Sequence, residues 1–130
     1  MLEGLTTEII SNVEKDLRKY PDWILRLETS GLGITSKAFK DYKTYDLKSM
    51  IESSVEFDEY TKRKIVAIEG VYDIRLNERK RKLIDLRYFQ DEPRYKVMRE
   101  LNIKNKNEYY RIRDFCILSF ARVLGYLKDA

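Results

Sequence analysis

The amino-acid sequence predicts an all-α protein. Only five glycines and two prolines occur in 130 residues, and most of them lie where a helical pattern breaks. Apolar residues recur at spacings of three and four, and residues typical of helix caps precede several of these runs. We expect two regions. Residues 1–56 form an N-terminal helical region, and residues 57–130 contain a central helix followed by two helices that are joined by a short turn.

The N-terminal region begins with a predicted helix over residues 6–19, in which Thr6 or Thr7 is the cap. Pro21 is expected to interrupt this helix and to open a second, short one that ends at Leu27. Residues 29–37 are glycine- and hydroxyl-rich and predict a loop. The stretch 38–55 allows two interpretations, either short helices or a segment that is ordered only by a partner.

The central helix is predicted over residues 58–76, with Asp58 at its positive N-terminal end. Gly70 inside this helix indicates either a kink or a close contact with another helix. Asn77 is expected to cap a further helix that ends near Tyr88. The basic run 79–82 at its start fits equally a set of phosphate contacts or a solvated helix end.

A polar turn over residues 90–93 leads into a short predicted helix over 94–101, whose inner face has Val97, Met98 and Leu101. Residues 102–104 form a tight turn in which Ile103 is an apolar plug. Asn105 and Glu108 have the spacing of a capping box, which predicts that the next helix starts near Lys106.

The last helix has an apolar face and a polar face. The apolar face consists of Tyr109, Ile112, Cys116, Ile117 and Phe120. The polar face consists of Lys106, Asn107, Tyr110, Arg111 and Asp114. Cations, an amide and a phenol are the groups that bond base edges and phosphates in a major groove. A charged helical hairpin with a merely solvated face would show similar charges.

The charge is unevenly distributed along the chain, whose formal net charge is +4. Residues 58–130 hold 18 Lys and Arg against 12 Asp and Glu, whereas residues 1–57 hold 8 against 10. The basic field therefore belongs to the C-terminal part, and a polyanionic partner such as nucleic acid is expected there.

Several classes of protein are disfavoured. The chain has no histidine, and its one cysteine, Cys116, occupies a core-spaced position, so we do not expect an enzyme, a metal site or a cofactor. Asp91 and Glu92 are interpreted as charges at a helix N-terminus. The single cysteine favours the cytoplasm, and no apolar run is long enough for a membrane span.

Three segments carry a resemblance to a known family. Residues 83–89, 97–103 and 110–113 resemble the helix-turn-helix of sigma-factor region 4, although the turn is one residue longer than usual and has Asn102 where glycine is common. Residues 15–22, with their Tyr20-Pro21 step, are similar to the leader helix of the RinA/ArpU-type phage late-gene regulators. The longer turn leaves two registers, one position apart, for the recognition helix.

This resemblance implies an activator of phage or phage-satellite late genes that binds double-stranded promoter DNA and acts with bacterial RNA polymerase. Carried over by position, the groove-facing residues are Lys106, Asn107, Tyr110 and Arg111. The phosphate-contacting residues are Arg94 and Tyr95.

The main alternative is a protein-interaction module that binds RNA polymerase or another regulator without touching DNA. The C-terminal apolar stripe over residues 120–127 is expected either to pack on the N-terminal helices or to form a homodimer seam. The sequence leaves open whether an antagonist or modulator protein binds the chain.

Overall fold

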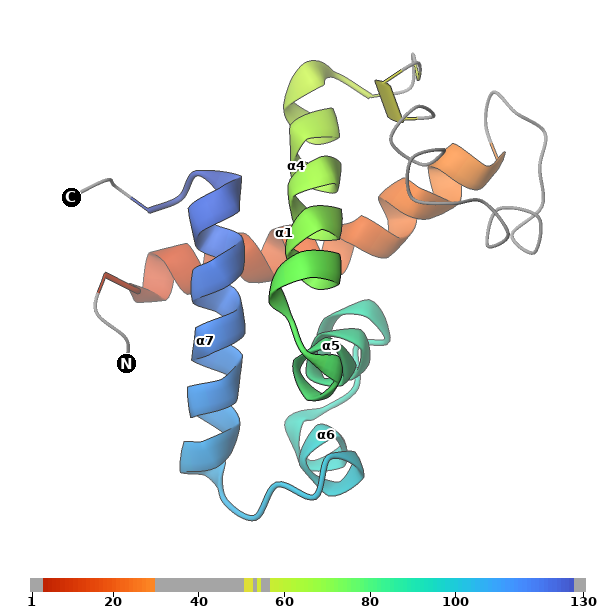
Figure 1. Cartoon of the computed structure of the whole chain (residues 1–130). Coiled ribbons are helices and arrows are strands. Elements are labelled where there is room, and N and C mark those ends of the chain that lie inside the picture. Colours follow the sequence, from red (N-terminus) through yellow and green to blue (C-terminus); the bar gives the residue numbers. More distant parts are fainter. Residues whose placement is uncertain (1–3, 30–50, 53, 55–56, 128–130) are drawn as a thin grey trace.

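The predicted all-α class is confirmed by a computed structural model, which describes residues 4–29, 51–52, 54 and 57–127 (Figure 1). No strand occurs among these residues, and none of their helices is long and apolar enough to cross a membrane. The predicted loop beyond Thr29 and most of the stretch 38–55 lie outside the described residues. The elements are α1 (Thr7–Thr29), α4 (Glu59–Gly70), η1 (Val71–Arg75), α5 (Glu78–Ile84), η2 (Asp85–Phe89), α6 (Arg94–Glu100) and α7 (Lys106–Leu124).

The prediction that Pro21 separates two helices is wrong, because α1 runs through it without a break. Thr6 is the residue that caps this helix, since its hydroxyl accepts a 3.1 Å hydrogen bond from the backbone N–H of Ile9. The buried stripe of α1 keeps its helical spacing on both sides of the proline. Its members are Ile10, Val13, Leu17, Trp23 and Leu27. Packing along the whole stripe offsets the missing backbone hydrogen bond at Pro21.

The cap predicted for α5 is confirmed, and Asp58, expected only as a favourable charge at the start of the central helix, is the N-cap of α4. The Asp58 carboxylate accepts a 2.7 Å hydrogen bond from the backbone N–H of Thr61, and the Asn77 side chain accepts one of 2.9 Å from Lys80. Gly70 marks a change of helix type, because the π-helical turn η1 begins directly after it. A Cβ atom added at Gly70 would meet nothing within 4 Å, so the alternative of a close helix contact is wrong.

The helices α4 and α7 lie side by side, and α1 crosses both of them (Figure 1). The α5–η2 segment and α6 lie at the end of the molecule where α7 begins (Figure 1). One hydrophobic core joins α1 to the C-terminal helices. Its largest fully buried side chains are Val13, Leu17, Ile51, Ile65, Ile68, Val71, Leu83, Ile84, Tyr88, Tyr109, Ile117 and Phe120.

A buried carboxylate connects α1 to two other parts of this core. Asp16 accepts a 3.0 Å hydrogen bond from the Lys64 ammonium of α4 and one of 2.6 Å from the hydroxyl of Tyr126, which follows α7. Leu124 and Leu127 pack against the same core. Most of the C-terminal stripe therefore packs on the core shared with α1, as one of the two sequence interpretations expected, whereas Val123 of the stripe is 50% exposed.

Candidate nucleic-acid interface

The connection between α6 and α7 has the local structure that the sequence predicts. Val97 and Ile103 are buried beneath it, and the Ile103 N–H donates a 2.8 Å hydrogen bond to the carbonyl oxygen of Met98. Asn102 has φ of 55°, in the left-handed region that asparagine tolerates better than most residues. Asn102 thus takes a conformation that suits glycine, which explains why it can stand at this point of the turn.

The cap of α7 also agrees with the prediction. The Asn105 side chain accepts a 2.9 Å hydrogen bond from the backbone N–H of Glu108, and the helix begins at Lys106. The other half of the predicted capping box is wrong. The Glu108 carboxylate accepts a hydrogen bond of 3.2 Å from the guanidinium of Arg79 in α5, rather than folding back on the Asn105 backbone.

The apolar face of α7 is largely as predicted. Tyr109, Cys116, Ile117 and Phe120 are buried, and Ile112 is half-buried. On the predicted polar face, Lys106, Asn107 and Arg111 are exposed.

Two residues assigned to that polar face lie elsewhere. Asp114 is only 8% exposed, and Tyr110 is half-buried. Both belong to a second line of helical spacing that continues to the buried residues Ile117 and Ala121. This line is covered because α7 packs against α1 and α4 together, so more than one side of the helix is enclosed.

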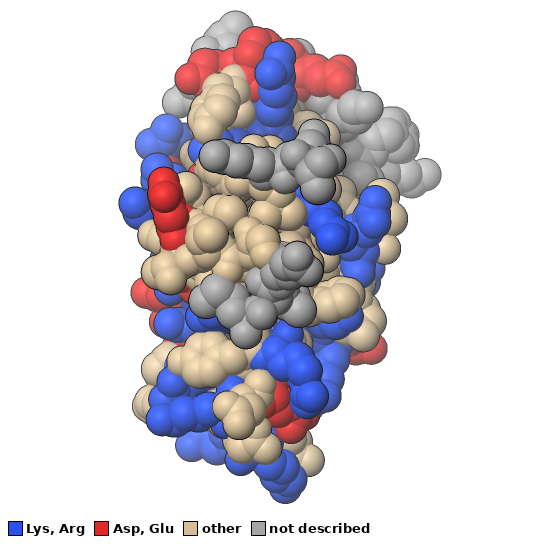
Figure 2. Space-filling view, turned by 90° about the vertical axis from the view of Figure 1, so that its left-hand side faces the viewer, with Lys and Arg blue, Asp and Glu red and all other residues tan. Residues whose placement is uncertain are grey.

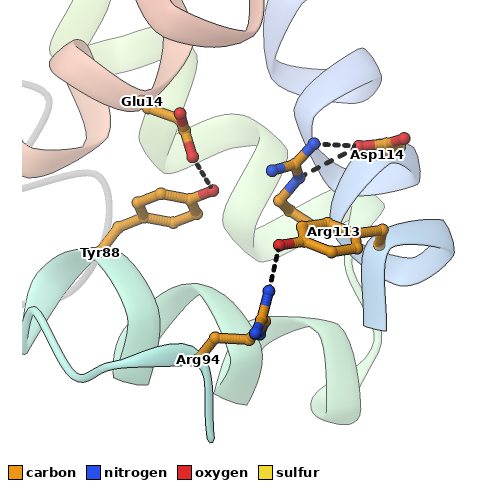
Figure 3. Close-up of polar contacts among 6 residues, drawn as sticks. Glu14, Tyr88, Arg94, Arg113 and Asp114 are labelled. Atoms are coloured by element: carbon orange, nitrogen blue, oxygen red, sulfur yellow. Dashed lines mark hydrogen bonds and ion pairs between the residues drawn. The ribbon is translucent and has the colours of Figure 1, made fainter. Parts of the chain in front are cut away.

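The Tyr110 side chain contacts two arginines, Arg94 and Arg113, both labelled in Figure 3. The Arg94 guanidinium, from the first residue of α6, donates a 2.6 Å hydrogen bond to the Tyr110 hydroxyl. The Arg113 guanidinium lies 4.7 Å from the centroid of the same ring and donates a 2.7 Å hydrogen bond to Asp114. The sequence analysis did not select Arg113, although its i+3 spacing from Tyr110 is the signal that could have identified it.

Of the six predicted site residues, the structure brings Arg94 and Tyr110 into direct contact. Tyr95, beside Arg94 on α6, is 68% exposed. Lys106, Asn107 and Arg111 extend from the first two turns of α7 into solvent. The start of α7 thus offers one amide and two cations to solvent. These groups can bond anionic oxygens and base edges without further rearrangement of the helix.

The basic run at the start of α5 mostly contacts its own chain. The Lys80 ammonium lies 3.7 Å from the centroid of the Phe115 ring on α7, and Arg79 forms an ion pair with Glu108. Arg81 donates hydrogen bonds of 2.8 and 2.6 Å to the carbonyl oxygens of Tyr72 and Asp73. Lys82 is exposed. Neither sequence interpretation of this run anticipated such contacts within the chain.

The charge is unevenly distributed over the surface on the α7 side of the molecule. Figure 2 shows Lys and Arg side chains around the lower part of this face, at the height where α6 and α7 begin in Figure 1. A large group of Asp and Glu side chains lies at the opposite, upper end (Figure 2). The end of the molecule with the candidate residues is thus the end richer in positive charge.

The cysteine and the acidic pair that the sequence singled out have structural roles. Burial raises the pKa of the Cys116 thiol to about 12, so this thiol is neutral at physiological pH. Asp91 pairs with Arg18 at 3.7 Å, and Glu92 pairs with Lys96 at 3.2 Å. In the part of the chain that the structure describes, no group of three His, Cys, Asp or Glu residues could hold a metal ion.

No family model, no curated protein and no solved structure matches this chain.

Proposed function

We propose that this chain is a sequence-specific DNA-binding transcription regulator, and that α6 and α7 form its helix-turn-helix. The observation that carries the proposal is the solvent-exposed start of α7, where Lys106, Asn107 and Arg111 extend outward from a capped helix. A helix of this kind, presented by a short preceding helix and a tight turn, has the geometry that enters a major groove.

Two further features support the proposal. Asn107 and Arg111 are four residues apart, so both can face the same groove, where an amide favours adenine and a guanidinium favours guanine. Arg94 and Tyr95 at the start of α6 are then placed to contact the DNA backbone. The resemblance to the RinA/ArpU-type regulators extends the proposal to activation of phage or phage-satellite late genes together with host RNA polymerase.

Selection of duplexes from a random pool by the full chain tests sequence-specific binding directly, and the selected duplex then serves as the probe. We expect Arg111→Ala to weaken binding to this probe by about 1–3 kcal/mol and to relax the preference at one position. Arg122→Ala removes the same charge at the far end of α7 and is the matched control. Failure to enrich any sequence, or equal binding by wild type and a Lys106→Ala, Arg111→Ala double variant, would contradict the proposal.

A second candidate function is a protein-interaction module without DNA contact, and it is favoured by one observation. Phe115, one turn beyond Arg111 on α7, is 47% exposed although it is a large apolar residue. The two functions differ in their dependence on salt. DNA binding that neutralises several phosphates weakens steeply as the salt concentration rises, whereas an apolar protein contact does not.

A further inference from the structure

Arg79 belongs to α5 and is not one of the six candidate interface residues. Its Nη2 atom donates to the Oε1 atom of Glu108 at 3.2 Å and to the carbonyl oxygen of Leu101 at 3.4 Å. Leu101 is the C-cap of α6, and Glu108 belongs to the first turn of α7. One nitrogen atom therefore contacts the chain on both sides of the turn that joins the two helices.

We propose that Arg79 is a positioning residue that fixes the orientation of α7 relative to α6 for DNA docking, an inference that rests on the proposed function. Lys80 strengthens the same contact between helices, because its ammonium lies over the Phe115 ring two turns further along α7. Two successive residues of α5 thus hold one side of α7, while Arg94 of α6 holds Tyr110.

The Arg79–Glu108 ion pair also neutralises a negative charge at the candidate interface. Glu108 is the acidic residue in the first turn of α7, next to the exposed cations Lys106 and Arg111. Without Arg79 its carboxylate would be an unpaired negative charge close to DNA phosphates. The ion pair removes that repulsion and limits the directions in which the start of α7 can move.

The contact is partly solvated, and this separates positioning from folding. The Arg79 side chain is 46% exposed and that of Glu108 is 26% exposed. Pairs of this kind contribute little to the stability of the folded chain. Substitution of Arg79 should therefore leave the melting temperature nearly unchanged while altering the population of α7 that is correctly oriented for docking.

The test measures binding of the full chain to its selected duplex for wild type, Arg79→Ala, Glu108→Gln and the double variant. Because a partly exposed pair of this kind contributes at most about 1 kcal/mol, we expect Arg79→Ala to raise the Kd by about two- to fivefold. The loss of DNA affinity caused by Arg79→Ala should be smaller in the Glu108→Gln background, because no unpaired carboxylate then remains. Lys82→Ala is the matched control, since it removes the same charge from the same basic run.

The outcomes separate this inference from the proposed function. If wild type binds no duplex, the proposed function fails; if wild type binds and Arg79→Ala binds equally well, only the positioning role fails. Equal losses for Arg79→Ala and Lys82→Ala, with equally reduced salt dependence, would make Arg79 an ordinary phosphate contact. Amide hydrogen exchange gives a readout without DNA, in which residues 102–105 should exchange faster in Arg79→Ala. Unchanged exchange there would overturn the positioning role.

Discussion

The guanidinium of Arg94 donates a 2.6 Å hydrogen bond to the hydroxyl of Tyr110, and this bond joins the first residue of α6 to α7. The sequence assigned these two residues to different tasks, phosphate contact and groove contact. In the structure they form one unit, with the Arg113 guanidinium 4.7 Å from the centroid of the Tyr110 ring. A change at either residue therefore alters the position of the other.

The first prediction follows from this unit and concerns coupling between Arg94 and Tyr110. Tyr110→Phe removes only the hydroxyl, so Arg94 loses its hydrogen bond but keeps an aromatic ring beside it. We expect the effects of Tyr110→Phe and Arg94→Ala on DNA affinity to be non-additive by about 0.5–1 kcal/mol, as for other residues in direct contact. A double-mutant cycle by fluorescence anisotropy measures this coupling, and strictly additive losses would show that the bond plays no part in binding.

The second prediction concerns two buried tyrosines with opposite hydrogen-bonding states. The Tyr88 hydroxyl donates a 2.6 Å hydrogen bond to Glu14 of α1 (Figure 3), whereas the buried Tyr109 hydroxyl makes no well-formed hydrogen bond among the described residues, although the Arg87 guanidinium lies near it. We expect Tyr88→Phe to lower the free energy of unfolding by about 1–2 kcal/mol, because a bond to a charged group is lost. Tyr109→Phe should be neutral or slightly stabilising.

Urea unfolding of both phenylalanine variants checks this prediction, and each serves as the control for the other because the change in side-chain volume is the same. Equal destabilisation by the two substitutions would contradict it.

The third prediction tests the continuity of α1. A proline inside a helix removes a backbone hydrogen bond and costs about 3 kcal/mol relative to alanine, although it also restricts the unfolded chain. Because α1 continues through Pro21, we expect Pro21→Ala to raise the free energy of unfolding by about 1–2 kcal/mol. Thermal or urea unfolding measures the change. Loss of stability in this variant would instead favour a break in the helix at Pro21.

The fourth prediction concerns pH. Burial raises the pKa of Cys116 to about 12, whereas the pKa of an unfolded cysteine is about 8.5. The unfolded chain therefore releases this proton first, so stability from the buried thiol is complete below about pH 8.5 and is lost as the pH rises above that value. Between pH 8.5 and 10, the free energy of unfolding of wild type should therefore fall by about 1–2 kcal/mol more than that of Cys116→Ala.

Alkylation gives an independent check on the same thiol. At pH 8 the native chain should react with iodoacetamide far more slowly than the urea-unfolded chain, since the thiolate is the reactive form. Similar rates in the two states would contradict the burial of Cys116.

The sequence alone determined the local features of this protein. The caps at Asn77 and Asn105, the position of Asp58 at a helix N-terminus, the turn around Ile103 and the apolar faces of the C-terminal helices were all predictable. The reason is that capping bonds and helical spacing link residues three or four apart, whose relation is fixed once the helix forms. The exposure of Lys106, Asn107 and Arg111 follows from the same rule.

The tertiary structure decided the features that depend on residues far apart in the chain. Pro21 lies inside a continuous helix because both halves of α1 pack on one core, and Asp114 is buried because α7 is enclosed on more than one side. Arg79 and Glu108 are 29 residues apart, so no local pattern could pair them. Local spacing shows which residues share a helix face, whereas only the packing of helices shows what each face meets.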